Sequence, residues 1–335
     1  MAAGAAGRGV LVIGAQGVLG TALARAFEEA GWRVVRGVRR SDVARGSTVV
    51  DLDRPETVAA AIAGVDLVVD PVPHPELTAE RVVLREGGAL IDVSMRPAAA
   101  GRRLREGTTS ARGTVVLNAG RTPGVSNLVA ADLLAAHPDA DAVEIACSFS
   151  AGGVSGRAGG ESLHRHLTSA RRHRTAVIPF PAPVGPTRCL RFAESEDGWL
   201  GDLAAHRTVA TYARFSPRAL HRAVLIANTL RLMQALPLAA FVRRGRNRPI
   251  DLTTEPLTEW VAVRRQGVHL AARTITGAGN YRVTAAATLV LAEALLDPAR
   301  RDRVRPGCFE PQELFALPEL EADLRQRGLA VNATT

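Results

Sequence analysis

The 335-residue sequence contains no lysine, so all 42 of its basic residues are arginines. This absence excludes Schiff-base chemistry and every other mechanism that needs a catalytic lysine. Aromatic residues are also scarce, at 4%, and only two of them are tyrosines, Tyr212 and Tyr281. Few side chains are therefore available to stack on nucleic-acid bases.

The basic net charge of +9 and the isoelectric point near 10.9 would by themselves favour an acidic partner. The arginine runs at 171–174, 243–248 and 300–305 are scattered along the chain, however, and form no single basic segment. A high basic total alone indicates solubility and nonspecific attraction. We attribute it to compositional bias and expect no nucleic-acid partner.

Cysteines are few, and Cys147, Cys189 and Cys308 form no CxxC pair. A disulfide framework or a structural zinc site is therefore not expected, and reduced thiols fit the cytoplasm. No apolar run reaches the roughly 18–20 residues of a membrane span, since the best candidate, "TAAATLVLAEALL", is interrupted by Glu293. The start of the sequence lacks the apolar centre of a signal peptide. We expect a cytoplasmic protein without a membrane span.

The first 120 residues alternate between strand and helix patterns. Strands are predicted at "GVLVIG", "RVVRGV", "STVVDL", "VDLVVD", "ALIDVS" and "GTVVLNAG", with helices at 18–30, in "RPETVAAAIAG" and in "PELTAERVVLREGG". Continuous Val, Ile and Leu runs are typical of parallel strands that are covered on both faces. The pattern predicts an α/β fold, a Rossmann-type doubly wound sheet that forms a dinucleotide-binding domain over residues 1–121.

The pattern changes after residue 121. Helices are predicted in "TPGVSNLVAADLLAAH", "ESLHRHLTSARRHR" and 217–235, and strands in "DAVEIACSFSAG", "RTVATYARF", "EWVAVRRQ" and "VHLAARTITG". This indicates an α+β substrate and dimerisation domain over 122–279, built on a mostly antiparallel open sheet. Residues 280–335 are expected to form a helix and tail that return to the first domain. The apolar segment 218–242 is expected to lie in the core or in an interface.

Three glycines, Gly14, Gly17 and Gly20, follow the first predicted strand and open the first helix. Such a turn permits a tight bend, a close approach of the backbone to a pyrophosphate, and close packing of helix on strand. The spacing resembles that of short-chain dehydrogenases, but the Tyr-x-x-x-Lys pair is missing, since Ser216 and Ala285 occupy the fourth positions after the tyrosines. The cofactor-binding residues of this turn are expected to be Gly14, Gln16, Gly17, Val18, Leu19 and Gly20, with Gly17 at the pyrophosphate.

The residues after the second strand select between the two nicotinamide cofactors. NAD sites place an acid there, whereas this sequence has Arg39, Arg40 and Ser41, which suit a 2′-phosphate. We therefore predict NADP(H) as the cofactor. Asp51 and Leu52, at the end of the third strand, are expected beside the adenine.

The loops after the fourth and fifth strands carry the candidate catalytic residues, because ligands bind outside the carboxyl ends of such strands. His74, in "DPVPHPE", is a candidate proton donor, although a solvated or helix-capping histidine would look the same. Asp92 and Ser94 also end a strand there and could hold a proton-donating water.

A metal site is not expected. His164 and His166, two positions apart on a predicted helix, face different directions and form no metal cluster with Glu161. His164 or Arg157 could instead bind a substrate carboxylate if this helix borders the cleft.

The sequence resembles the saccharopine dehydrogenase-like oxidoreductases of the saccharopine reductase type. The resemblance is carried by "GAQGVLG", "DLVVDPVP", "ALIDVS", "LNAGRTPGVSNLVAADLL", "GNYRVTAAATLVLAEALL" and "RPGCFEPQEL", in that order along nearly the whole chain. It implies a homodimer that transfers hydride between NADP(H) and a C=N bond of a small, often amino-acid-derived molecule. It also implies that Pro71, Val72 and Pro73 border the nicotinamide, and that the substrate lies near Asn118, Arg121, Thr122 and Pro123.

We therefore predict an NADPH-dependent reductase of an imine or an activated alkene, in secondary metabolism. Placement of the nicotinamide against an electrophilic carbon is the main requirement of such chemistry. Two alternatives stay open at this stage. The chain could be a non-catalytic NADP(H) sensor or regulator, which the missing acid–base pair permits, or an isomerase or cyclase that uses the cofactor without net turnover.

Overall fold

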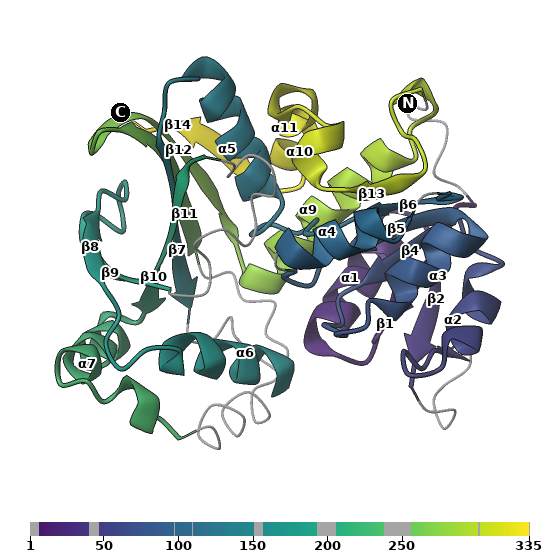
Figure 1. Ribbon diagram of the computed structural model, residues 1–335, viewed down its shortest axis with the longest axis horizontal. Coiled ribbons are helices and arrows are strands. Elements are labelled where there is room, and N and C mark those ends of the chain that lie inside the picture. Colours follow the sequence, from purple (N-terminus) through teal and green to yellow (C-terminus); the bar gives the residue numbers. More distant parts are fainter. Residues whose placement is uncertain are drawn as a thin grey trace. The chain divides into compact units, whose positions relative to one another are not determined.

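The computed structural model describes residues 7–39, 47–96, 98–108, 110–150, 157–192, 206–237, 256–300 and 302–334. The chain divides into two compact units, each with its own sheet (Figure 1). Unit 1 comprises Met1–Leu128 and Thr284–Arg327, and unit 2 comprises Val129–Val283 and Gly328–Thr335. The C-terminal part of the chain therefore contributes to both units.

Unit 1 contains a seven-stranded sheet in which all neighbouring strands are parallel, in the order β13-β6-β5-β4-β1-β2-β3. The chain leaves the adjacent strands β1 and β4 in opposite directions, and ligands bind at such a switch point in doubly wound sheets. The strands are β1 (Gly9–Ile13), β2 (Arg33–Val38), β3 (Ser47–Val49), β4 (Leu67–Asp70), β5 (Gly88–Asp92), β6 (Gly113–Val116) and β13 (Gly307–Phe309).

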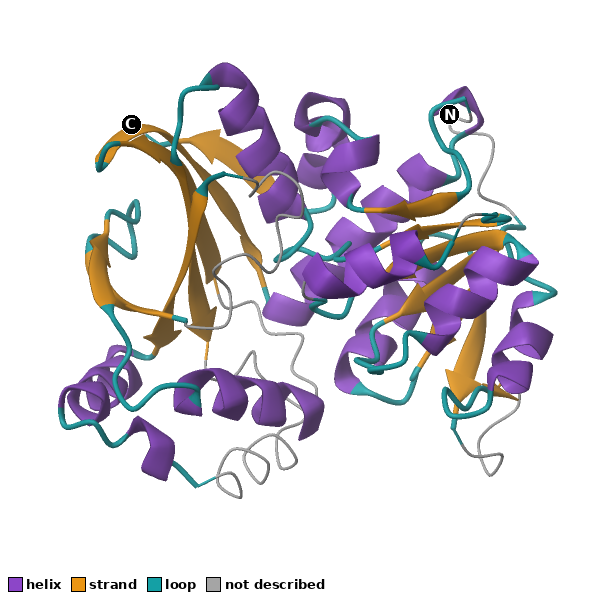
Figure 2. Ribbon diagram, viewed as in Figure 1, coloured by secondary structure: helices purple, strands orange, loops and turns teal. Residues whose placement is uncertain are grey.

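Helices cover both faces of this sheet (Figure 2). All residues of β1 and β4 are buried, which explains their continuous apolar runs. The helices are α1 (Val18–Glu29), α2 (Pro55–Ile62), α3 (Thr78–Glu86), α4 (Ala98–Glu106), α9 (Asn280–Leu295), α10 (Pro311–Leu314) and α11 (Leu317–Gln326), with a short 3₁₀ helix at Pro298–Arg300. Helix α5 (Val125–Ala136) begins in unit 1 and continues into unit 2.

Alternate residues of β1 separate the two layers of the core. Leu11 and Ile13 belong to one cluster with residues of α2, α3 and α4, including Val58, Val83 and Leu104. Burial of these side chains is worth about 1.5–3 kcal/mol each. This layer fixes the helices that follow β3, β4 and β5, and therefore the loops that lead into them.

Unit 2 contains a mixed seven-stranded sheet in the order β14-β12-β11-β7-β10-β9-β8. Strands β7 and β10 are parallel, and all other pairs are antiparallel. Helices α6 (Arg157–Thr168) and α7 (Arg218–Thr229) also belong to this unit, as does a 3₁₀ helix at Met233–Ala235. The strands are β7 (Ala142–Ser150), β8 (Thr175–Ile178), β9 (Thr187–Arg191), β10 (Thr208–Ser216), β11 (Pro256–Arg265), β12 (Val268–Ala278) and β14 (Ala330–Ala333).

The predicted fold class is confirmed, with a doubly wound parallel sheet and a second, mostly antiparallel sheet. The sequence pattern did not predict α4, the β8–β9 hairpin or the edge strands β13 and β14. The helix predicted over 217–235 ends at Thr229, and residues 238–242 of the apolar segment lie outside the described part of the chain.

Within the described ranges, no helix is both long and apolar enough to cross a membrane. The same residues contain no group of three or more histidine, cysteine or acidic side chains arranged to hold a metal ion.

Candidate functional site

The glycine turn between β1 and α1 is built by close backbone contacts. Gly14 has a φ of +62°. The backbone amide of Gly17, across the turn, donates a hydrogen bond to the Gly14 carbonyl oxygen at 2.8 Å. A Cβ atom at Gly20 would overlap that same carbonyl. A Cβ at Gly14 would lie 2.7 Å from Cγ2 of Val72, in the loop after β4. Two of the three glycines are therefore required by the packing itself.

The turn leaves the N-terminus of α1 without a side-chain cap. Gly17 is the N-cap residue, and the first turn carries no acidic side chain. The amides of Val18, Leu19 and Gly20 have no partner within the helix, because the first three or four amides of any helix lack one. Gln16 and Gly17 are exposed. These donors and the helix dipole suit the pyrophosphate of a dinucleotide.

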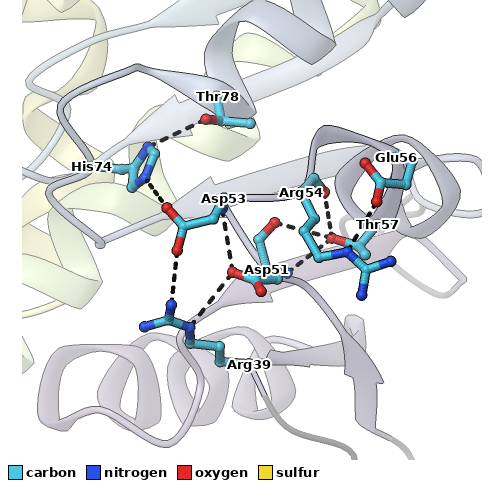
Figure 3. Close-up of polar contacts among 8 residues, drawn as sticks. All are labelled: Arg39, Asp51, Asp53, Arg54, Glu56, Thr57, His74 and Thr78. Carbon is cyan, nitrogen blue, oxygen red and sulfur yellow. Dashed lines mark hydrogen bonds and ion pairs between the residues drawn. The ribbon is translucent and has the colours of Figure 1, made fainter.

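Arg39, directly after β2, lies over the loop that follows β3 (Figure 3). Its side chain is 73% exposed and forms ion pairs with Asp53 at 2.7 Å and Asp51 at 3.5 Å. Leu52 is buried in the core, so its backbone is the part available to a ligand. Arg40 and Ser41 lie outside the described residues.

His74 lies between two partners in Figure 3. Its Nε2 is 3.2 Å from Oδ1 of Asp53, and its Nδ1 is 3.2 Å from Oγ1 of Thr78, the first residue of α3. Both ring nitrogens therefore have partners, and one of these lies after β3. The role of His74 as a proton donor stays a prediction.

Asp92 and Ser94 lie at the carboxyl end of β5 and are buried. Asp92 Oδ1 accepts hydrogen bonds from the Ser94 amide at 2.6 Å and from its hydroxyl at 2.5 Å. Asp92 Oδ2 accepts from Nε of Arg96 at 2.5 Å, and Arg96 also pairs with Glu80 at 2.9 Å. The carboxylate of Asp92 is therefore fully engaged within the protein.

Two further carboxyl groups surround this ion pair. Burial and the charge of Asp92 raise the pKa of Asp70 to about 7. Burial, followed by the charges of Asp92 and Asp70, raises the pKa of Glu80 well above its usual range. Asp70, Glu80 and Arg96 were not predicted: Asp70 ends an apolar strand as Asp92 does and could have been found by that signal, whereas no local pattern marks Glu80 or Arg96.

The residues after β6 form a second buried polar group. Asn118, at a φ of +56°, accepts from the Arg96 amide at 2.7 Å and donates to the Arg96 carbonyl at 3.0 Å. Its amide also lies 3.3 Å from Glu310, whose pKa burial raises to about 7. Arg121 and Pro123 are buried and Thr122 half-buried. Their predicted substrate role stays a prediction.

His164 and Arg214 are the notable polar side chains of unit 2. His164, on α6, contacts the Leu236 carbonyl oxygen at 2.8 Å. Arg214, on β10, was not predicted and is only 8% exposed. Among the residues that the structure describes, its Nε has no hydrogen-bond partner and its guanidinium forms no ion pair. Burial lowers its pKa.

Comparisons with known proteins show what this chain is similar to. Residues 10–82 match the model of the NAD dependent epimerase/dehydratase family. No curated protein matches the sequence. Among solved structures, saccharopine dehydrogenase (L-Glu forming) from Saccharomyces cerevisiae is 12% identical with a TM-score of 0.65, and the match covers 98% of this chain and 100% of that chain.

A meso-dapdh variant with DAP from Clostridium tetani E88 is also similar, at 13% identity and a TM-score of 0.48, covering 96% of this chain and 98% of that chain. At 12% identity, the likeness to saccharopine dehydrogenase is one of fold. The resemblance that the sequence motifs indicate is confirmed in this sense: the chain has the fold of saccharopine dehydrogenase.

Substitution of Asp70 by asparagine should change how stability depends on pH. The folded-state pKa of Asp70, about 7, lies above its ordinary value of 3.8, so its favourable contribution is present below pH 4 and is lost as the pH rises towards 7. Relative to the wild type, D70N should gain on the order of 4 kcal/mol of unfolding free energy between pH 4 and pH 8. Urea unfolding across this range measures the gain.

D323N, at an exposed position on α11, is the matched control and should follow the wild-type curve. Parallel curves for D70N and the wild type would show that Asp70 ionises normally in the folded chain.

Proposed function

We propose that this protein is an NADPH-dependent reductase that transfers hydride to the C=N bond, or to an activated C=C bond, of a small and often amino-acid-derived metabolite. The proposal rests on the glycine turn at the switch point of the parallel sheet, which leaves the N-terminus of α1 without a side-chain cap. A cytoplasmic homodimer in secondary metabolism is part of the same proposal.

The preference for NADPH rests on Arg39. Its guanidinium is exposed, and its present partners, Asp51 and Asp53, are carboxylates on a surface loop. A 2′-phosphate carries more charge than either carboxylate and offers three acceptor oxygens. The phosphate can therefore replace Asp53 as the partner of Arg39 at little cost, because exposed ion pairs contribute at most about 1 kcal/mol.

An anionic group on the substrate is favoured by Arg214. A buried guanidinium without a counter-ion is costly, and binding of a carboxylate offsets that cost. Ser148 lies directly across from Arg214 on the neighbouring strand β7 and is also buried. Its hydroxyl adds a hydrogen-bonding group at the same level of the sheet.

The bound cofactor would supply the hydride, and the chain's own groups would bind, orient and protonate. The amides at the start of α1 hold the pyrophosphate, and Pro71, Val72 and Pro73 border the nicotinamide half. The hydroxyl of Ser94 donates to Asp92, so its oxygen can still accept from a water, and such a water would deliver the proton at the carboxyl end of β5. His74 remains the other candidate donor.

A non-catalytic NADP(H)-binding role is the second candidate. It is favoured by one observation, that the candidate acids His74 and Asp92 both have partners within the protein. Absorbance at 340 nm in the presence of NADPH and candidate cyclic imines or unsaturated acids separates the two. The proposal expects turnover, whereas tight NADPH binding without turnover across such a panel would support the sensor.

Arg39 should determine the preference between the two cofactors. R39A should weaken NADPH binding about tenfold or more while changing NADH binding by less than about threefold, because only NADPH carries the 2′-phosphate. Isothermal titration calorimetry with both cofactors measures this. R36A removes a nearby exposed arginine that pairs with Glu28, and should leave both affinities unchanged. Equal losses for NADPH and NADH in R39A would contradict the assignment.

Arg214 should affect substrate binding and leave cofactor binding unchanged. With any turned-over carboxylate substrate, R214M should raise KM about tenfold or more, because a buried charge-assisted hydrogen bond contributes about 1.5–3 kcal/mol. The affinity for NADPH should not change. The control R218M removes an exposed neighbouring arginine on α7. An unchanged KM in a folded R214M chain would show that Arg214 has no role in recognition.

A further inference from the structure

Arg96 contacts the loop after β4 as well as its acidic partners. Its Nη1 donates to the carbonyl oxygen of His74 at 2.6 Å, and its Nη2 donates to that of Val72 at 3.2 Å. The side chain is only 6% exposed and follows β5 in the chain. One buried guanidinium therefore joins the loops after two adjacent strands.

Both backbone polar groups of Val72 are hydrogen-bonded. Its amide donates to Oδ1 of Asp70 at 2.8 Å, and its carbonyl oxygen accepts from Arg96. Its side chain lies over Gly14, where an added Cβ would come within 2.7 Å of Cγ2. The contacts of Arg96 therefore extend, through a single residue, to the glycine turn.

The acidic partners fix the orientation of Arg96. Asp92 accepts a hydrogen bond from Nε and Glu80 accepts one from Nη2, so the planar guanidinium is bound along two edges. Asp92 is itself held by the amide and the hydroxyl of Ser94. A lysine carries one point charge and cannot reproduce these separate directions of donation.

We propose that Arg96 is a positioning residue that holds the segment 71–74 against the glycine turn in the geometry that the dinucleotide requires. Arg96 acts through Val72 and His74 and not by touching the cofactor, since its own guanidinium is occupied by protein oxygens. This inference rests on the proposed function in taking the turn as the cofactor site.

The role predicts a selective loss of binding. In R96K the segment 71–74 loses its fixed position, so the affinity for NADPH should fall about tenfold or more. The affinity for 2′,5′-ADP, which lacks the nicotinamide half, should change by less than about threefold. Calorimetric titration of both ligands measures the split, and a general structural defect would weaken them equally.

Hydrogen exchange without any cofactor tests the same inference independently. Amides in the 71–78 segment should exchange about tenfold faster in R96K than in the wild type, with no change in unit 2. Arg85 is an exposed arginine on α3 that pairs with Glu86. Its variant R85K is the matched control and should behave as the wild type. D92N removes the charge that orients Nε and should shift exchange in the same direction if R96K does not fold.

The outcomes separate this inference from the proposed function. Faster exchange in R96K together with a wild type that binds no NADPH would overturn the proposed function and leave the positioning of the segment supported. Unchanged exchange in both R96K and D92N, or equal losses for NADPH and 2′,5′-ADP, would overturn the role of Arg96.

Discussion

Parallel pairing of all seven strands in unit 1 is the constraint on which the candidate site depends. Because every strand runs the same way, the loops after β1, β4 and β5 all emerge at one edge. The glycine turn and the segment 71–74 therefore meet there, and the contact between Val72 and Gly14 follows from their neighbouring strands.

The charged groups at this edge are of two kinds. Arg39 and Asp53 are exposed, so their ion pair can exchange for a ligand at little cost. Asp70, Glu80 and Asp92 are buried around one guanidinium, and burial first, then the charges of the neighbouring acids, raise the pKa values of Asp70 and Glu80. The exposed pair is suited to recognition, whereas the buried group is suited to holding two loops in a fixed relation.

The sequence was informative wherever local pattern decides the structure. The strand, glycine turn and helix from β1 to α1 were predicted because apolar runs and glycine spacing are local signals. Strand β13 was missed because three residues at Gly307–Phe309 carry no period, and their pairing with β6 spans almost 200 positions. The partners of Arg96 were missed for the same reason, since no local signal links it to Glu80.

The two buried arginines, Arg96 and Arg214, differ in whether other protein groups neutralise their charge. Arg96 has carboxylates and carbonyl oxygens around its guanidinium. Its charge is therefore neutralised within the fold, and its hydrogen bonds are made to the protein and not to a ligand. Arg214 has no such partner in the part of the chain that the structure describes, and its pKa is lowered by burial. An anion bound beside Arg214 would offset the cost of burying that charge, and this is why we propose that the substrate carries a carboxylate.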